Sequence, residues 1–333
     1  MMFIFTLSSG VIMAISASSW FMAWVGLELN LMSFIPIILT NNNQYSSEAA
    51  LKYFLIQTLG SSLIIFSSSL FLFTSKISVI MIISSLLLKL GAAPFHFWFP
   101  QIMEGMSWPQ LIILMTIQKI APLSLIMMMV YYQQAYNLII MSIMLSAMIG
   151  SIMGINQTSL RKIMAFSSIN HIAWMLAATI LSEMMTFMYF LFYCFISSSV
   201  ALIFHMKQAF YINHLIDKEK SSNLYNLPVF AALFSLGGLP PFTGFIPKWM
   251  IIQELNNYNM IMLFIILLSC ALITLYFYLR IGIPFLTFSS PSLKSSLETS
   301  SKKKNFSFIS FYFFCKFIWF VNSNTVFNYL KNK

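Results

Sequence analysis

Four ionisable residues lie inside long apolar runs of this sequence, namely Glu28, Lys89, Lys119 and Lys248. A charged side chain at the centre of a membrane helix costs about 2.5–3.5 kcal/mol on insertion scales, so four would cost on the order of 10 kcal/mol unless they are paired or hydrated. Burial favours the neutral amine of a lysine, whereas a nearby carboxylate favours its ammonium. A carboxylate followed by three buried lysines is therefore a series of sites with coupled protonation, which suits proton transfer.

Two of these lysines lie beside helix-breaking residues. The breaks consist of Gly91 and Pro94 after Lys89, and of Gly237, Gly238, Pro240 and Pro241 before Lys248. Glycine and proline both oppose a continuous helix. Irregular backbone at membrane depth persists only where it is packed in protein or lines a wet cavity. We therefore expect two discontinuous membrane helices, each with a lysine near its break.

The two breaks also resemble each other in sequence. Leu90-Gly-Ala-Ala-Pro-Phe-His-Phe97 and Leu236-Gly-Gly-Leu-Pro-Pro-Phe-Thr243 share a Leu-Gly step and a later Pro-Phe step. Interrupted segments at corresponding positions of two halves are the sequence pattern of transporters built from inverted repeats. The match is short, but it favours a transport site between two such repeats.

Three further residues are candidates for a supporting role. His171 and His96 could relay protons, because a neutral imidazole both donates and accepts a hydrogen bond. The alternative for each is a buried histidine whose hydrogen bonds are satisfied. Lys52 stands four residues after Glu48, a spacing that lets the two side chains neutralise each other near the membrane interface.

Composition places the chain in a lipid bilayer. Of its 333 residues, 59% are hydrophobic and only 8% are charged, whereas soluble domains have about 25% charged residues. The mean hydropathy is +0.84. The net charge of +10 comes from basic residues scattered at the ends of apolar runs, without a DNA-binding module, so we expect no nucleic-acid partner.

The sequence contains no motif that is typical of a metal or cofactor site. Cys194, Cys270 and Cys315 stand singly in apolar runs, without a Cys-x-x-Cys pair or a histidine at ligand spacing. No Gly-x-Gly-x-x-Gly or Walker loop is present to hold a nucleotide. We expect this chain to bind no metal or cofactor, so any redox groups that it serves would lie in other chains.

The apolar runs predict an all-α, polytopic membrane protein of about eleven transmembrane helices. The first is expected over Phe3–Trp24, the second over Gly26–Thr40 and the eleventh over Asn305–Tyr329. Alternating the loops between two faces gathers most of the basic residues on one face, including Arg161, Lys162, Lys207 and Arg280. This bias puts the N-terminus on the matrix or cytoplasmic side and the C-terminus opposite.

Several motifs together resemble one known family, the antiporter-like membrane subunits of mitochondrial NADH:ubiquinone oxidoreductase (respiratory complex I). The motifs occur in family order: Trp24-Val-Gly-Leu-Glu-Leu-Asn30, Lys89-Leu-Gly-Ala-Ala-Pro-Phe-His-Phe-Trp98, Gln118-Lys-Ile-Ala-Pro122, Ser167-Ser-Ile-Asn-His171 and Leu236 to Trp249. The family is itself similar to cation/proton antiporters. The resemblance covers residues from about 20 to 282.

The resemblance implies proton translocation coupled to quinone reduction in other subunits. Glu28 matches the carboxylate that is partnered with Lys89, Lys119 matches the connecting central lysine, Lys248 matches the lysine toward the exit side, and His171 matches a central histidine. NADH, FMN, iron–sulfur clusters and ubiquinone would be bound by other subunits. The expected partners are other membrane-arm subunits and the lipid bilayer, including cardiolipin, in the mitochondrial inner membrane.

The resemblance also divides the chain. Residues 1–282 would form the antiporter-like transmembrane core, with inverted repeats and two discontinuous helices. Residues 283–333 would be a polar linker followed by a C-terminal transmembrane helix. Two other readings stay open: a stand-alone cation/proton antiporter, which the same broken helices and lysines suit, and a membrane scaffold, which leaves four buried charges without a purpose.

Overall fold

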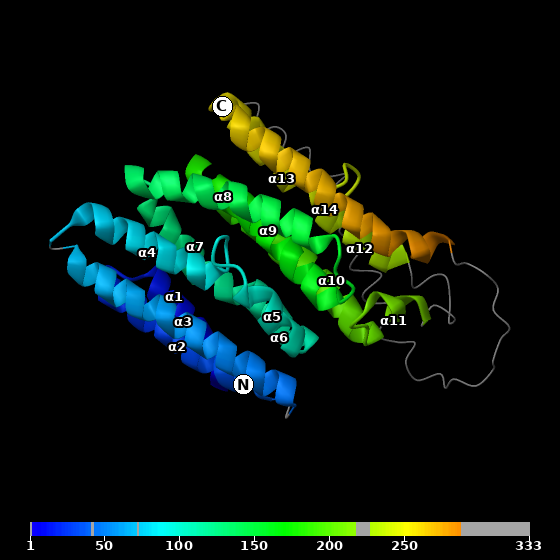
Figure 1. Ribbon diagram of the computed structural model, residues 1–333, viewed down its shortest axis with the longest axis horizontal. Coiled ribbons are helices and arrows are strands. Elements are labelled where there is room, and N and C mark those ends of the chain that lie inside the picture. The colour runs from blue at the N-terminus through cyan, green and yellow to red at the C-terminus, as the bar shows by residue number, and fades with distance from the viewer. Residues whose placement is uncertain (1, 41–42, 72, 218–226, 288–333) are drawn as a thin grey trace.

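The fold of this chain is described by a computed structural model over residues 2–40, 43–71, 73–217 and 227–287 (Figure 1). These residues form α-helices joined by short connections, with one isolated β-bridge between Ser159 and Tyr211. The predicted eleventh helix lies outside the described residues. The all-α, polytopic fold with two discontinuous helices is thus confirmed, while the count of eleven stays a prediction.

Within the described residues, the helices follow one another without an intervening sheet. Their bounds are α1 Met2–Ile15, α2 Trp20–Ile38, α3 Gln44–Leu70, α4 Ser75–Leu90, α5 Trp98–Gly105, α6 Trp108–Met115, α7 Ile117–Met129, α8 Gln133–Gly154, α9 Leu160–Leu181, α10 Glu183–Lys207, α11 Ile212–Asp217, α12 Leu227–Gly237, α13 Phe245–Asn257 and α14 Ile261–Thr287. Helix α14 therefore extends five residues beyond the core boundary expected at residue 282.

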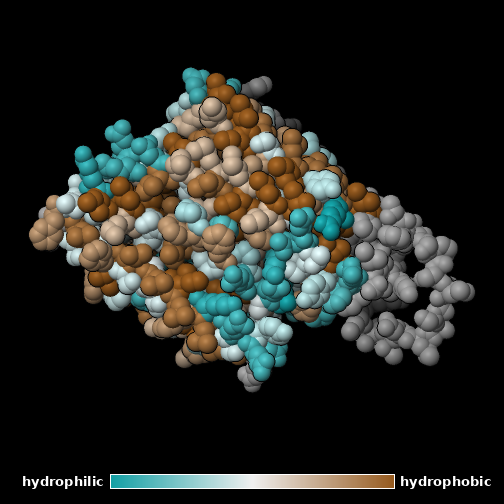
Figure 2. All heavy atoms as spheres, in the orientation of Figure 1, coloured by the Kyte–Doolittle hydropathy of each residue, from teal (hydrophilic) through white to brown (hydrophobic). Residues whose placement is uncertain are grey.

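Most of the long helices run in a similar direction, with α1–α3 on one side of the bundle and α14 on the other (Figure 1). Seven helical segments of the described residues are long and apolar enough to cross a membrane. Apolar side chains dominate the middle of the face drawn in Figure 2, and hydrophilic ones gather toward opposite ends of the helices. This distribution fits a bundle embedded in lipid between two aqueous faces.

Helix α9 is the centre of the bundle. Of its most apolar stretch, 94% is buried, compared with 33–50% for the other six candidate spans. It packs against α8, α10 and α13 among others. A polar group on α9 is therefore surrounded by protein rather than by lipid, and must find its hydrogen bonds inside the bundle.

The predicted boundary between the first two spans was wrong. Helix α1 ends at Ile15, and α2 already begins at Trp20, inside the range expected for the first span. The connection is rich in serine, and the Ser19 hydroxyl caps α2 by accepting a hydrogen bond from the Met22 amide at 3.4 Å. As a consequence Glu28 lies in the middle of α2 instead of near the start of a short helix.

Both predicted helix breaks have the same backbone geometry. Helix α4 ends before Gly91, with φ of 74°, and α12 ends before Gly238, with φ of 77°. At each break the glycine amide and the amide after it bond to carbonyls three and five residues back. This is the Schellman motif, in which a left-handed glycine terminates a helix. Of the two adjacent glycines, Gly238 makes the turn, while Gly237 remains the last helical residue.

A third discontinuity was not anticipated. The span around Lys119 is divided at Thr116, which separates α6 from α7 and has φ and ψ of −110° and −78°. The Thr116 hydroxyl donates to the Ile112 carbonyl at 2.6 Å, and Pro122 lacks the amide that would continue the hydrogen-bond ladder. Lys119 therefore lies in the first turn of a new helix, in the middle of a membrane span.

The second break predicts different responses at its two glycines. Gly238→Ala should lower the free energy of unfolding by about 1–2 kcal/mol, because a side chain at positive φ is strained. Gly237→Ala is the matched control, since a Cβ there would meet its nearest neighbour at 3.6 Å and alanine favours a helix. The thermal midpoints of the purified variants compare the two; equal midpoints would contradict this assignment of the turn.

Candidate functional site

Glu28 and Lys89 form the first part of a polar row in the interior, where Glu28 is half-buried with its Oε2 atom buried and Lys89 is buried. Lys89 lies in the last turn of α4 and is 7% exposed. Its stem passes Gly60 of α3, where an added Cβ would come within 3.1 Å of Lys89 Cγ. The two groups are close enough for the Glu28 charge to act on Lys89. They form no direct ion pair: among the described residues, pairs within 4 Å join only Lys52 to Glu48 and Lys162 to Glu104.

A small polar cavity connects Lys89 with Lys119. It has a volume of about 20 Å³, which is enough for a water molecule. Asn30 and Gln118 also line it. Their buried Oδ1 and Nε2 atoms have no hydrogen-bond partner among the described residues. Buried polar atoms of this kind are usually bonded to protein or to ordered water, so the chemistry of this cavity suits water between the two lysines.

Lys119 is one of the most completely buried side chains, at 2% exposure. Its Nζ donates a hydrogen bond to the Tyr193 hydroxyl of α10 at 3.0 Å. The same nitrogen lies 4.5 Å from the Tyr193 ring centroid and 5.5 Å from that of Phe99 on α5. Aromatic faces attract a desolvated ammonium, so this cation is stabilised by a hydroxyl and two rings, with no carboxylate of the described residues within ion-pair distance.

His171 lies on α9 between Lys119 and Lys248, and both lysines are close enough for their charges to act on its ring. His171 Nδ1 is 2.9 Å from the Tyr189 hydroxyl, and the ring also hydrogen-bonds the Leu236 backbone. A carbonyl can only accept, so the ring nitrogen facing Leu236 donates. In the neutral ring Nδ1 then accepts from Tyr189.

Lys248 is held by the end of the broken helix α12. Its Nζ donates to the Gly237 carbonyl at 2.9 Å and lies 5.9 Å from the Trp174 ring centroid. The last carbonyls of a helix have no intrahelical partners and form the negative end of its dipole. In α12 the Leu236 and Gly237 carbonyls are left in this way, and they bind His171 and Lys248. The break therefore supplies acceptors for one ammonium group and one imidazole N–H.

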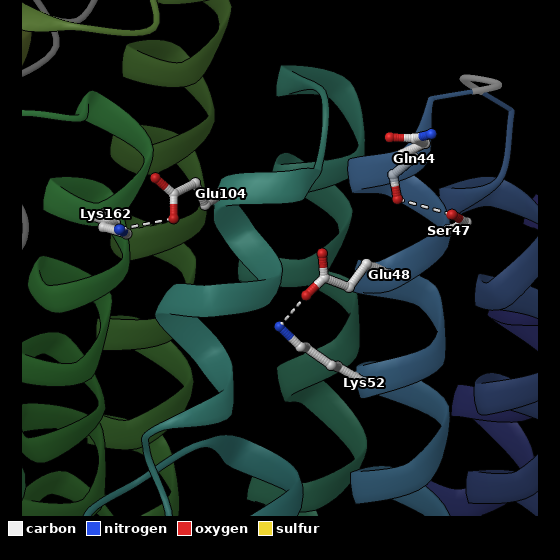
Figure 3. A network of polar contacts seen from close by, with 6 residues as sticks. All are labelled: Gln44, Ser47, Glu48, Lys52, Glu104 and Lys162. Carbon is white, nitrogen blue, oxygen red and sulfur yellow. Dashed lines mark hydrogen bonds and ion pairs between the residues drawn. The ribbon is translucent and has the colours of Figure 1, made fainter.

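Two candidates from the sequence lie outside this row. Lys52 is 43% exposed and forms the predicted ion pair with Glu48, at 2.6 Å, on the surface of α3 (Figure 3). His96 is buried in the loop after Gly91, where Nδ1 is 3.3 Å from the Pro94 carbonyl and the ring packs on Phe97. The structure brings neither side chain to the buried lysines.

Sequence reasoning missed the polar residues that connect the lysines. Tyr189 and Tyr193 are one helical turn apart in an apolar span, which is a readable signal for hydroxyls that share one face of a helix. Asn30 and Gln118 each lie within two positions of a predicted site residue, Glu28 and Lys119, but no local pattern indicates that both line one cavity. Their approach depends on how α2 and α7 are positioned around the cavity, together with α3, α4 and α5.

Comparison with known proteins gives consistent matches. The family model described as the transmembrane part of NADH:quinone oxidoreductase and Mrp antiporters matches residues 17–79 and 72–274. The NADH-ubiquinone oxidoreductase chain 2 of Anopheles gambiae is 48% identical over 289 residues, covering 84% of each chain. That of Lumbricus terrestris is 38% identical over 302 residues and 89% of each chain.

Solved structures share the fold at lower identity. A chain of respiratory complex I from Thermus thermophilus, determined with bound aureothin, superposes with a TM-score of 0.79 at 21% identity, over 87% of this chain and 71% of that one. A chain of the Mrp complex from Dietzia sp. gives a TM-score of 0.74 at 17% identity, over 84% of this chain and 59% of that one. The chain therefore belongs to the NADH-ubiquinone oxidoreductase chain 2 family, within the wider family of complex I and Mrp antiporter membrane subunits.

Proposed function

We propose that this chain is a membrane-arm subunit of a proton-pumping NADH:ubiquinone oxidoreductase and that it translocates protons through its buried Glu/Lys row. The observation that carries the proposal is the continuous placement of Glu28, Lys89, Lys119, His171 and Lys248 through the protein interior, with a water-sized polar cavity between the first two lysines. The relatives are named as chains of NADH-ubiquinone oxidoreductase, and we propose that this reaction drives the proton transfer.

Charge coupling explains how such a row could move protons. Protonation of Lys89 raises the cost of a proton on Lys119, and the cavity between them offers water as a carrier. His171 and Lys248 continue the row to the end of α12, whose carbonyls stabilise a cation. Glu28 sets the charge on Lys89 at the other end. A change of charge near Glu28 would therefore displace protons along the whole row.

The redox chemistry is assigned to other subunits of the assembly. NADH, FMN, iron–sulfur clusters and ubiquinone would be bound there, and this chain would respond to quinone reduction through its charges alone. Its neighbours would be other membrane-arm subunits and lipid, including cardiolipin. Residues 1–282 would act as the antiporter-like core, and residues 283–333 as a linker with a further membrane helix.

The orientation follows from the basic residues at the helix ends. Arg161 and Lys162 begin α9 and Arg280 lies in the last part of α14, so the alternation of spans puts all three at the end of the bundle where α1 begins. Arg280 donates to the Ile155 carbonyl at 2.7 Å, and Lys162 pairs with Glu104 at 2.7 Å (Figure 3). By the positive-inside rule this end faces the matrix of the mitochondrial inner membrane, with the C-terminus opposite.

The alternative of a stand-alone antiporter differs in where activity resides. Reconstituted alone in vesicles, this chain should exchange no cations for protons, because its charges respond to a reaction in partner subunits. In the assembled complex, NADH oxidation should acidify one side of the membrane. Exchange by the isolated chain, without NADH or quinone, would favour the antiporter.

Replacing a buried lysine should abolish the contribution of this chain to proton pumping. We expect Lys89→Met, Lys119→Met and Lys248→Met to lower NADH-driven proton uptake at least about tenfold, as expected when a proton-transfer group is lost. Lys76→Met is the matched control, because Lys76 is exposed at the opposite end of α4 from Lys89. Proton uptake by vesicles measures the effect; wild-type rates in the three buried variants would refute the proposed row.

The carboxylate at the start of the row should respond in the same assay. Glu28→Gln removes the charge that acts on Lys89 with little change in volume, so we expect slower pumping at unchanged assembly. Glu48→Gln is the control, since Glu48 is 61% exposed and pairs with Lys52 at the surface. The ratio of protons moved to NADH oxidised compares the two, and an equal ratio in both would remove Glu28 from the row.

A further inference from the structure

Two tyrosine hydroxyls occupy the gap between Lys119 and His171. Tyr193 accepts the hydrogen bond of Lys119 at 3.0 Å, and Tyr189 lies 2.9 Å from His171 Nδ1. Both tyrosines are on α10, one turn apart, and both are at most 3% exposed. The Tyr193 and His171 ring centroids are 5.2 Å apart. Hydroxyls therefore contact the two proton-bearing groups from one helix.

A second small cavity lies between these side chains. It has a volume of about 10 Å³ and is lined by His171, Tyr189, Tyr193 and Ser235 among others. This is close to the smallest space that holds one water molecule. The Ser197 hydroxyl donates to the Tyr193 backbone carbonyl at 2.7 Å, so the Tyr193 hydroxyl hydrogen can serve as the donor to a water in this cavity.

We infer that Tyr193 and Tyr189 are proton-relay residues that connect Lys119 to His171 through this second cavity. The inference rests on the proposed function, since it specifies one step of the same row. It assigns α10, which contributes no titrating lysine or carboxylate to the row, the role of joining α7 to the central helix α9. A hydroxyl suits this role because it accepts one proton while releasing another.

The transfer balances without any other reactant than water. An N–H bond of the Lys119 ammonium breaks as its proton bonds to the Tyr193 oxygen, and the former Tyr193 proton passes to a water in the cavity. That water gives a proton to the Tyr189 oxygen, and the former Tyr189 proton bonds to His171 Nδ1. Lys119 becomes an amine and His171 an imidazolium, while both tyrosines and the water end neutral.

The phenylalanine variants separate this role from packing. Tyr193→Phe keeps the ring that faces Lys119 at 4.5 Å and removes only the hydroxyl, and Tyr189→Phe does the same beside His171. In the assembled complex we expect each variant to lower NADH-driven proton uptake at least about tenfold. The remaining uptake should show a larger solvent deuterium isotope effect than the wild type, because proton transfer across the gap has become limiting.

Tyr136→Phe is the matched control. Tyr136 lies in the span α8, and its hydroxyl bonds Met260 Sδ at 3.9 Å, away from the row, so this variant should pump normally. If Lys119→Met fails to pump but an assembled Tyr193→Phe or Tyr189→Phe variant pumps at the wild-type rate, the relay is wrong and the proposed function stands. If Lys119→Met also pumps normally, the proposed function fails. Native electrophoresis shows whether each variant assembles into the complex. If one tyrosine variant does not assemble, the other still tests the relay.

Discussion

Burying an ammonium group inside a lipid-embedded bundle is the constraint on which the rest of this structure depends. Neither Lys119 nor Lys248 has a carboxylate within ion-pair distance among the described residues, so other acceptors must offset the loss of water. Lys248 uses a carbonyl that the end of α12 leaves unpaired, and Lys119 uses a phenol with two aromatic faces. Neutral acceptors stabilise the ammonium less strongly than a carboxylate would, so the lysine can still release its proton. A proton carrier requires such a release.

The discontinuous helices serve this constraint directly. A Schellman turn at Gly91 or Gly238 ends a helix in the middle of the bundle, and only protein groups can satisfy the carbonyls that it exposes. At the first break Gln57 and Trp98 donate to the Lys89 and Leu88 carbonyls. At the second break His171 and Lys248 are the donors to the carbonyls at the end of α12. The two breaks thus share a backbone geometry but differ in use, since one is closed by neutral donors and the other by titratable groups.

Much of this could be predicted from the sequence, because insertion of apolar runs in lipid is a local property. The span pattern, both breaks, the buried positions of Lys89, Lys119 and Lys248 and the place of Glu28 within a span follow from hydropathy, glycine, proline and charge. The boundary near Ser19 was placed wrongly because serine in an apolar run does not separate the end of a helix from its interior. Choosing between Gly237 and Gly238 needed the backbone dihedral angles.

The connections between the lysines could not be predicted, because they depend on how helices distant in sequence pack. The contact of Lys119 with Tyr193 joins residues 74 positions apart, and Asn30 meets Gln118 only across a cavity. Lys52 and His96 show the converse, since each was a candidate for a supporting role from its place in the sequence, but neither lies beside the buried lysines in space.

The central claim is that a hydrated row of buried groups joins Glu28 to Lys248. A structure of the assembled complex at a resolution that shows ordered water tests it most directly. The account predicts water in the first cavity, bonded to Asn30 and Gln118 and within reach of Lys89 and Lys119. A cavity closed by apolar side chains, with Lys89 and Lys119 separated by dry packing, would contradict it.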